Sequence, residues 1–417
     1  MSAVTGSPLP RPGEGAFGKE RIRVLYEVQA AAGQIEAIAQ AIAVEQSVEL
    51  PLAAITDQRV LDHTVGQIHS IRPLGDASGA SEGDGIVHAW VDHSPLGRRG
   101  LDRYEVAIDL ALDTMGLAGS ASRALDIAQM MNMLFGNTSL HAHVQLVDVE
   151  WPECLTGTFA GPRFGLEGIR DHTGARGRAL TCAALKPQGL PIEVLAKLCH
   201  TFALAGIDII KDDHGLSDQA YSPFAERVRA CQGALDKVRD AMGVRTIYAP
   251  SLTGSPRRLI EQARIAEDTG CAMVMMAPSL IGLPVFAEMV ADHISVPVLA
   301  HPSMGGAARI APPLLFGSLF RLLGADASIF VNHGGRFAYS RGQSLLIAEH
   351  ARKPLLGTRA ALPVPAGGMT VERVPEMLND YGENVMLLIG GSLLIAREDL
   401  LERTRAFVHS VHAHGRA

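Results

Sequence analysis

The segment Lys211-Asp212-Asp213-His214 carries the clearest chemical signal in the chain, because it places charged groups directly after the apolar run 207–210. Alternation along an extended strand puts Lys211 and Asp213 on one face. A lysine amine held among carboxylates at a strand end is an ion-paired structural group, a Schiff-base nucleophile or an acceptor of CO₂ that forms a carbamate. Only the carbamate makes it an oxygen ligand, which would match Asp213 around a hard cation such as Mg²⁺.

Two glycine pairs and one histidine provide the next signal. Gly367-Gly368 and Gly390-Gly391 each follow a short apolar run, as does His301. Glycines let backbone N–H groups approach an anion closely, so the pairs predict a phosphate site, although turns use glycine equally well. His301 is a base, a hydrogen-bond partner of a substrate or a satisfied loop histidine.

From about residue 178 onward, short apolar runs alternate with helical patterns. The runs cover residues 179–185, 207–210, 246–249, 272–276, 296–300, 327–331, 362–364 and 385–389. This alternation predicts a closed (β/α)₈ barrel, in which catalytic groups lie at the C-terminal ends of the strands. The charged segment, the histidine and the glycine pairs all follow such run ends. An open doubly wound sheet is the alternative, but it would more naturally carry a glycine fingerprint after its first strand, where this chain reads LKPQG.

The chain before residue 153 has a mixed pattern. Strand-like alternation covers residues 21–28, 66–72, 85–91 and 143–150, and helical patterns cover 34–45 and 120–134. This order predicts a small α+β domain of the ferredoxin-like type over residues 21–152, ahead of the barrel domain over 153–417. Residues 1–20 are rich in Ser, Pro and Gly and predict a flexible leader.

The composition narrows the class of protein. The 417 residues are 47% hydrophobic and 19% charged, which is enough apolar material for a large core. The net charge of −7 and the lack of a long basic block disfavour nucleic acid as a partner. No uninterrupted apolar stretch reaches the ~18 residues that would suggest a membrane span. Five scattered cysteines without a CxxC pair predict reduced thiols in a cytoplasmic protein.

Taken in chain order, these residues form a recognisable set. Lys186-Pro187 follows the first run of the barrel, the charged segment the second, His301 the fifth, and the glycine pairs the seventh and eighth. In this order the chain resembles the ribulose-bisphosphate carboxylase-like (RuBisCO-like, form IV) proteins, the non-carboxylating branch of the RuBisCO superfamily. The resemblance extends from about Arg21 to the last barrel helix. It implies a homodimer whose active site lies between the barrel of one subunit and the N-terminal domain of the other.

The resemblance also implies roles for individual residues. Lys211 corresponds to the carbamylated lysine that binds Mg²⁺, and Asp213 to the neighbouring aspartate ligand. The third ligand position is usually glutamate, whereas this chain has His214, a nitrogen donor that suits Mg²⁺ less well. Either His214 coordinates, or water replaces that ligand, or the metal is different or absent. Lys186 resembles the lysine that transfers a proton or orients the enediolate.

Substrate-binding positions follow from the same resemblance. Glu45 and Asn137 resemble the contributions of the N-terminal domain, and the glycine pairs resemble a phosphate-binding backbone. Other positions depart from the carboxylases, since Gln188 replaces a second lysine, Pro302 replaces an arginine for a second phosphate and Arg336 replaces the lysine that stabilises added CO₂. These departures predict a singly phosphorylated sugar or sugar acid as substrate and argue against CO₂ fixation.

The superfamily's chemistry implies an enediolate next to a carbonyl, with a metal as Lewis acid and a base that moves a proton. Arg336 and His333 at the barrel mouth would favour a substrate carboxylate. The expected reaction is therefore decarboxylation of a 3-oxo sugar-acid phosphate, as in apionate-type catabolism. One alternative is an enolase or isomerase of a ketose 1-phosphate, as in methionine salvage, which the chain resembles at His301-Pro302 but not at His214. Another is a non-catalytic metabolite-binding protein that has lost the metal.

Overall fold

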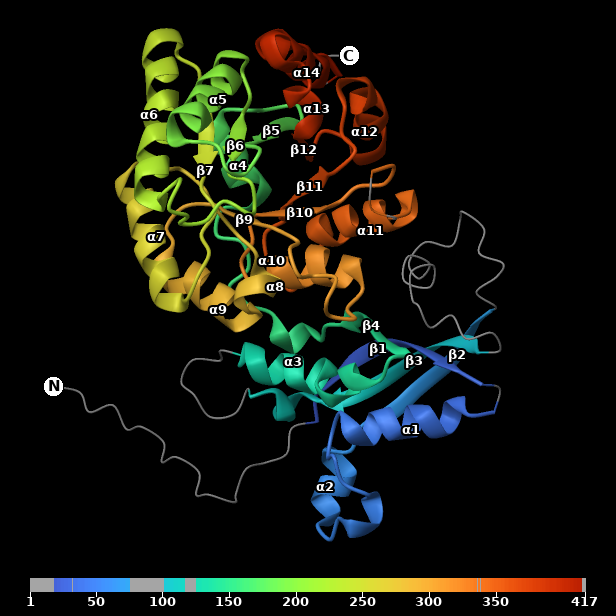
Figure 1. Cartoon of the computed structure of the whole chain (residues 1–417). Coiled ribbons are helices and arrows are strands. Elements are labelled where there is room, and N and C mark those ends of the chain that lie inside the picture. The colour runs from blue at the N-terminus through green and yellow to red at the C-terminus, as the bar shows by residue number, and fades with distance from the viewer. Residues whose placement is uncertain are drawn as a thin grey trace, which may run out of the picture.

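Two β-sheets organise the chain, one in the N-terminal part and one in the barrel (Figure 1). The computed structural model describes residues 19–31, 33–75, 101–116, 125–335, 337 and 339–414. Residues 1–18 of the predicted leader, the predicted strand 85–91 and Arg336 lie outside the described residues.

The N-terminal sheet is antiparallel, with the strand order β2-β3-β1-β4. Its strands are β1 (Arg21–Ala30), β2 (Gln67–Gly75), β3 (Asp102–Ala111) and β4 (Val144–Glu150). Its helices are α1 (Ile35–Glu45), the short α2 (Gln58–His63) and α3 (Ile127–Phe135). Alternate residues of β1 are buried, and Tyr26 donates a hydrogen bond to the Leu134 carbonyl of α3 at 2.7 Å. The order β1-α1-β2-β3-α3-β4 is that of the predicted ferredoxin-like class, which is confirmed.

The barrel contains all eight predicted strands in one parallel sheet, in the order β7-β6-β5-β12-β11-β10-β9-β8. The strands are β5 (Leu180–Ala184), β6 (Ile209–Lys211), β7 (Ile247–Ala249), β8 (Val274–Met276), β9 (Val298–Ala300), β10 (Ala327–Val331), β11 (Leu362–Ala366) and β12 (Met386–Ile389). The two ends of the sheet meet where the Leu252 amide donates to the Met275 carbonyl at 2.8 Å. The Met275 amide in turn donates to the Pro250 carbonyl at 2.9 Å. These bonds close the ring, so the predicted barrel is confirmed and the open sheet is excluded.

Helices surround the strands on the outside of the barrel (Figure 1). They are α4 (Gly165–Thr173), α5 (Ile192–Leu204), α6 (Phe224–Met242), α7 (Pro256–Asp268), α8 (Pro278–Ile281), α9 (Leu283–Glu288), α10 (Phe320–Leu322), α11 (Arg341–Arg352), α12 (Val374–Tyr381), α13 (Gly391–Leu394) and α14 (Leu400–His414). The π-helical turns η7 (Met289–His293) and η8 (Pro313–Leu319) extend two of these segments.

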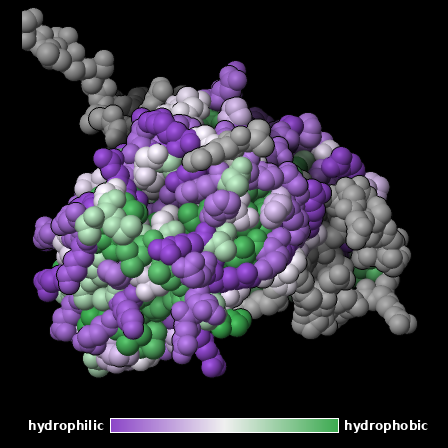
Figure 2. Space-filling model, turned by 90° about the horizontal axis from the view of Figure 1, so that it is seen from above, coloured by the Kyte–Doolittle hydropathy of each residue, from purple (hydrophilic) through white to green (hydrophobic). Residues whose placement is uncertain are grey.

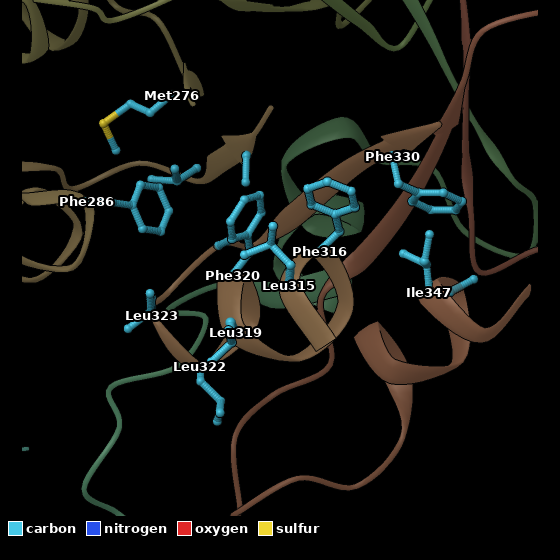
Figure 3. Packing of buried hydrophobic residues seen from close by; sticks show 14 of the residues in the cluster. Met276, Phe286, Leu315, Phe316, Leu319, Phe320, Leu322, Leu323, Phe330 and Ile347 are labelled. Atoms are coloured by element: carbon cyan, nitrogen blue, oxygen red, sulfur yellow. The ribbon is translucent and has the colours of Figure 1, made fainter. Parts of the chain in front are cut away.

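The larger hydrophobic core fills the layer between the barrel strands and these helices and continues between the N-terminal sheet and its own helices. Figure 3 shows Phe316 of η8 between Phe320 of α10 and Phe330 of β10, with Ile347 of α11 next to Phe330. The rings of Phe316 and Phe320 pack edge to face with centroids 5.5 Å apart. Burial of each such side chain contributes about 1.5–3 kcal/mol. The core therefore fixes η8 against β10, immediately beneath the barrel mouth.

Backbone hydrogen bonds also join the two parts of the chain. The Leu146 amide of β4 donates to the Arg309 carbonyl at 2.9 Å, and the Ala311 amide donates to the Leu146 carbonyl at 2.8 Å. The N-terminal sheet is thus extended by a segment that belongs to the barrel sequence. The domain boundaries at residues 20/21 and 152/153 stay a prediction.

The surface seen from above is a mosaic of hydrophilic and hydrophobic residues (Figure 2). None of the described helices combines the length and the apolar character that crossing a membrane requires.

Candidate active site

A cavity of about 870 Å³ opens where the barrel strands end at their carboxyl termini. Residues from six of the eight strand ends contribute to its wall. Among the predicted site residues, those that line it are Lys186, Lys211, Asp213, His214, His301, Gly367, Gly368, Gly390 and Gly391. The structure therefore brings together side chains separated by up to about two hundred positions in the sequence, as expected for a barrel-mouth site.

Asp212 anchors the charged segment on the side that faces away from the cavity. Its carboxylate accepts hydrogen bonds from the Tyr248 hydroxyl at 2.7 Å, the Ser251 amide at 3.0 Å and the Arg227 guanidinium at 3.3 Å. The Arg227–Asp212 ion pair is fully buried, so each charge depends on the other for compensation. Because Asp212 points into the protein, strand alternation turns its neighbours Lys211 and Asp213 toward the cavity.

Lys211 is buried at the end of β6, and its ammonium group donates to the Asp212 carbonyl at 2.6 Å. Burial lowers the pKa of Lys211, because the charged form loses its hydration. A lysine of lowered pKa is more often neutral, and the neutral amine is the form that adds CO₂. The environment of Lys211 therefore fits a carbamate.

Asp213 lies between two cationic or polar neighbours. Its Oδ1 atom is 2.6 Å from Lys186 Nζ and 3.4 Å from His214 Nδ1. Burial opposes ionisation, but the hydrogen bonds from His214 and Lys186 and the charge of Lys211 hold the pKa of Asp213 below its usual range. Asp213 is thus an ionised oxygen donor, and with His214 and a carbamate on Lys211 it would form a donor set for a divalent cation.

His214 and His301 stack with ring centroids 4.7 Å apart and an interplanar angle of 15°. The Ser303 amide donates to Nδ1 of His301 at 3.2 Å, which makes Nδ1 an acceptor and leaves the ring hydrogen on Nε2. Burial, together with the charge of Lys211, lowers the pKa of His301 to about 2. His301 is therefore a neutral hydrogen-bond donor toward the cavity rather than a cation.

The glycine pairs form a wall without side chains. Gly367 and Gly368 have φ angles of 92° and 66°, which favour glycine. A Cβ atom on Gly368 would lie 2.6 Å from the Cα of Gly335, so the loops after β10 and β11 meet at van der Waals distance. Gly390 lies against the aliphatic part of Lys186, with a Cβ position 3.8 Å from its Cε.

Two predicted residues of the N-terminal part lie away from this cavity. Asn137 donates from Nδ2 to Glu45 at 2.9 Å and to Glu49 at 2.8 Å, and none of the three is among the lining residues. Gln188 does not line the cavity either, since its side chain packs against Gly215, where a Cβ atom would overlap with it.

His333 turns away from the cavity. Its Nε2 atom lies 3.3 Å from Glu376 and 3.4 Å from Asp380, on the side that faces α12. The two carboxylates attract the imidazole and give it partners that the cavity does not offer. The expected pair of carboxylate-binding groups is thus reduced to Arg336, which lies outside the described residues.

The structure adds an apolar wall that the sequence analysis did not identify. It consists of Phe316, Phe330, Phe337, Tyr339 and Met369. These residues lie in core-like runs or in the loops after β10 and β11, where a single sequence does not distinguish a ligand wall from ordinary packing. In the sequence, the feature that points to this wall is Phe337, a large apolar residue that closely follows the pair Gly334-Gly335 in a loop.

A ferredoxin-like domain followed by a (β/α)₈ barrel, with a lysine and an aspartate at the end of the second barrel strand, defines the RuBisCO class of proteins. Residues 165–304 match the family model of the ribulose bisphosphate carboxylase large chain, catalytic domain. The chain is 47% identical to 5-methylthioribulose-1-phosphate isomerase of Rhodospirillum rubrum over 393 residues, which cover 94% of this chain and 96% of that protein. It is 44% identical to ribulose bisphosphate carboxylase-like protein 1 of Rhodopseudomonas palustris over 95% of this chain and 99% of that protein.

Solved structures agree with these sequence matches. The Rubisco-like protein from Rhodopseudomonas palustris superposes with a TM-score of 0.81 at 42% identity, covering 96% of this chain and 100% of that one. A rubisco-like protein from Alicyclobacillus acidocaldarius superposes with a TM-score of 0.79 at 27% identity, covering 95% and 94%. The chain belongs to the RuBisCO-like proteins of the ribulose bisphosphate carboxylase large-chain superfamily, as its motifs predict.

The expected decarboxylation of a 3-oxo sugar-acid phosphate is wrong. Besides the isomerase, the relatives include a 2,3-diketo-5-methylthiopentyl-1-phosphate enolase of Geobacillus kaustophilus, 33% identical over 69% of this chain and 72% of that protein. These names favour the enolase or isomerase alternative. The expectation depends on Arg336 and His333 as partners of a substrate carboxylate, and the imidazole of His333 is instead held by carboxylates of α12.

Proposed function

We propose that this protein is an enzyme that isomerises 5-methylthioribulose 1-phosphate by moving a proton next to its carbonyl group. The observation that carries the proposal is the 47% identity to an isomerase of that name along nearly the full length of both chains. The cavity supports the proposal, because its lining combines polar groups that could stabilise an enediolate with a glycine wall and an apolar wall.

Lys211 as a carbamate, Asp213 and His214 would hold Mg²⁺, which when bound supplies a Lewis acid that polarises the substrate carbonyl. Lys186 is the group proposed to move the proton, since its amine reaches the cavity and is held by Asp213 at 2.6 Å. Neutral His301 is proposed to donate a hydrogen bond from Nε2 to a substrate oxygen. Such positioned proton transfer contributes typically about 10²–10⁴-fold to a rate.

The two ends of the proposed substrate differ in polarity, and so do two walls of the cavity. The backbone of the glycine pairs at 367–368 and 390–391 is proposed to bind the single phosphate. The methylthio group is proposed to lie against Phe316, Phe337 and Met369. Sulfur makes favourable contacts with aromatic rings, and removal of the methyl group from water adds about 0.8 kcal/mol.

We further propose a cytoplasmic homodimer. Glu45 and Asn137 lie outside the cavity of their own chain, and in a dimer these side chains of one subunit would complete the cavity of the other. The assembly is tested by light scattering together with complementation of a Glu45→Gln subunit by a Lys211→Ala subunit. Recovery of activity in the mixture is expected if the site is shared, and two separately inactive proteins without recovery would contradict it.

A second candidate is the enolase reaction on 2,3-diketo-5-methylthiopentyl 1-phosphate, which the Geobacillus relative favours. Both reactions begin with removal of a proton from a carbon next to a carbonyl group, so the product distinguishes them. The experiment incubates the protein with each substrate in D₂O with Mg²⁺ and bicarbonate and follows ³¹P and ¹H signals. An isomerised phosphate ester from 5-methylthioribulose 1-phosphate, absent with Lys211→Ala and present with the exposed control Lys237→Ala, is expected. No conversion of either substrate would overturn the proposal and favour a binding protein.

A further inference from the structure

A second cavity lies between the N-terminal sheet and the barrel. Its volume is about 580 Å³, and it shares no lining residue with the active-site cavity. One wall comes from the end of β4 and the segment that follows it, and the other from η8 and the loop between α11 and β11. Cavities of this size hold small molecules, and boundaries between structural units are common places for them.

The acidic and the basic side chains of the cavity lie on different walls. The wall formed by the end of β4 and the segment after it carries Asp148, Glu150 and Glu153, and the barrel wall carries Lys353. Among the described residues, neither Asp148 nor Lys353 forms an ion pair within 4.0 Å. Glu150 is paired with Arg23 at 3.3 Å and is largely exposed. Half-buried Asp148 and Lys353 therefore face the same space with opposite charges that act on each other across it without a direct ion pair.

On the barrel side, a series of side-chain hydrogen bonds orients a second hydrogen-bond donor toward the cavity. Lys353 Nζ is 3.0 Å from Nε2 of His350, and Nδ1 of His350 is 3.1 Å from the hydroxyl of Ser318. An ammonium group only donates, so Nε2 accepts and the ring hydrogen is on Nδ1, which donates to Ser318. The Ser318 hydroxyl hydrogen then has no acceptor among the hydrogen bonds of the described residues, although this side chain is 2% exposed and lines the cavity.

The remaining wall is apolar. Trp151, Leu355 and Leu356 line it, and the Trp151 ring is fixed edge-on against Phe159 with centroids 5.5 Å apart. Leu356 has a φ angle of 47°, a left-handed conformation that a bulky side chain rarely adopts. The strained backbone is held at the cavity wall, as strained residues often are at ligand sites.

We propose that this cavity binds a small zwitterion of the α-amino-acid class with an apolar side chain. Its carboxylate would lie against Lys353 and Ser318, and its ammonium group against Asp148 and Glu153. The apolar side chain would cover Trp151, Leu355 and Leu356. A metal ion alone would leave Lys353 facing a second positive charge, and a dicarboxylate would meet the acidic wall, so neither satisfies both walls.

The experiment is calorimetric titration of the full chain with L-leucine and two matched analogues. One analogue is 4-methylpentanoate, which lacks the ammonium group, and the other is 3-methylbutylamine, which lacks the carboxylate. One leucine per chain is expected to bind, and each analogue is expected to bind at least about tenfold more weakly, since each leaves one half-buried charge without a ligand partner. The titration is repeated with phenylalanine and then with the other protein amino acids.

Variants locate the bound amino acid. Lys353→Met and the nearly isosteric Asp148→Asn are each expected to weaken binding at least about tenfold, whereas Lys353→Arg keeps the charge and retains binding. The exposed control Lys197→Met in α5 is expected to bind as wild type. Melting curves verify that each variant is folded, and turnover on the proposed substrate is expected to remain unchanged in Asp148→Asn.

Several results would overturn the proposal. They are the absence of binding by every protein amino acid at millimolar concentration, equal binding of leucine and 3-methylbutylamine, and binding that survives both Lys353→Met and Asp148→Asn. The assay measures binding directly, so its outcome is independent of whether the isomerase proposal holds.

Discussion

At the residue scale, the ion pair between Lys186 and Asp213 ties the proposed proton-transfer group to a proposed metal ligand. The two residues follow neighbouring strands β5 and β6, and their side-chain atoms approach to 2.6 Å at the cavity. Both residues lie at the ends of barrel strands, and the hydrogen-bonded sheet fixes their positions. A substitution of the Lys186 side chain is therefore expected to change turnover without unfolding the barrel.

Lys186→Met tests this expectation. Turnover is expected to fall about 10²–10⁴-fold, because the variant lacks the amine that moves the proton, while the melting temperature stays close to that of the wild type. The measurement is kcat together with a thermal melt, with Lys197→Met as the control. A variant that keeps turnover within about threefold of the wild type would assign the proton transfer to another group.

His214→Glu tests the unusual third ligand. An oxygen donor suits Mg²⁺ better than an imidazole, so Mg²⁺ affinity is expected to rise by about tenfold, measured by calorimetric titration in bicarbonate. The exposed His200→Glu in α5 is the matched control and is expected to change nothing. Unchanged Mg²⁺ affinity in His214→Glu would mean that position 214 lies outside the ligand shell.

At the element scale, the loops after β10 and β11 are held together at the cavity. Arg373 donates to the carbonyls of His333 and Gly368, both at 3.2 Å, and the same guanidinium pairs with Glu376 of α12. His333 and Asp380 extend this network, and Arg341 of α11 also pairs with Asp380. The network ties two active-site loops to α11 and α12, which explains why His333 is drawn away from the cavity.

Gly368→Ala tests how closely these loops pack. The added Cβ would meet the backbone of Gly335 at 2.6 Å, and the φ angle of 66° is strained for alanine, so a loss of stability of about 1–3 kcal/mol is expected. Gly233→Ala is the matched control, because it lies in α6 with open space around its Cβ position and is expected to stabilise by about 1 kcal/mol. Urea unfolding of both variants measures the difference.

The elements were predictable because they depend on local pattern. All eight barrel strands appeared as apolar runs, and α1 (Ile35–Glu45) matches the helical pattern predicted over residues 34–45 to within one residue. Strand alternation also placed Lys211 and Asp213 correctly toward the cavity. The same rule fails at His333, since it lies beyond the end of β10 and its direction is set by α12, more than forty positions later. Long-range charges of this kind leave no local period in the sequence.

At the scale of the whole molecule, buried titratable groups away from the active site connect stability with pH. His350 of α11 is 5% exposed, and burial, reinforced by the charge of Lys353, lowers its pKa to about 4 from the ordinary 6.5. The folded state therefore binds the proton less readily than the unfolded state. The stability linked to His350 is fully present above about pH 6.5 and is lost as the pH falls toward 4.

His350→Gln is expected to flatten this dependence. The wild type should lose up to about 3 kcal/mol of unfolding free energy through this residue between pH 6.5 and 4, and the variant should lose correspondingly less over the same range. Urea unfolding at a series of pH values measures the two slopes, with the exposed His200→Gln as control. Parallel slopes for wild type and His350→Gln would contradict the prediction.

The pairing of β4 with residues 309–311 was not predictable from the sequence, and it has a consequence for dissecting the protein. Without the barrel, β4 would present unpaired amide and carbonyl groups along an open sheet edge, including those of Leu146 that now bond to Arg309 and Ala311. Exposed edges of this kind invite pairing with other chains. An isolated N-terminal fragment is therefore expected to aggregate, with the barrel segment acting in the intact chain as the cover that prevents it.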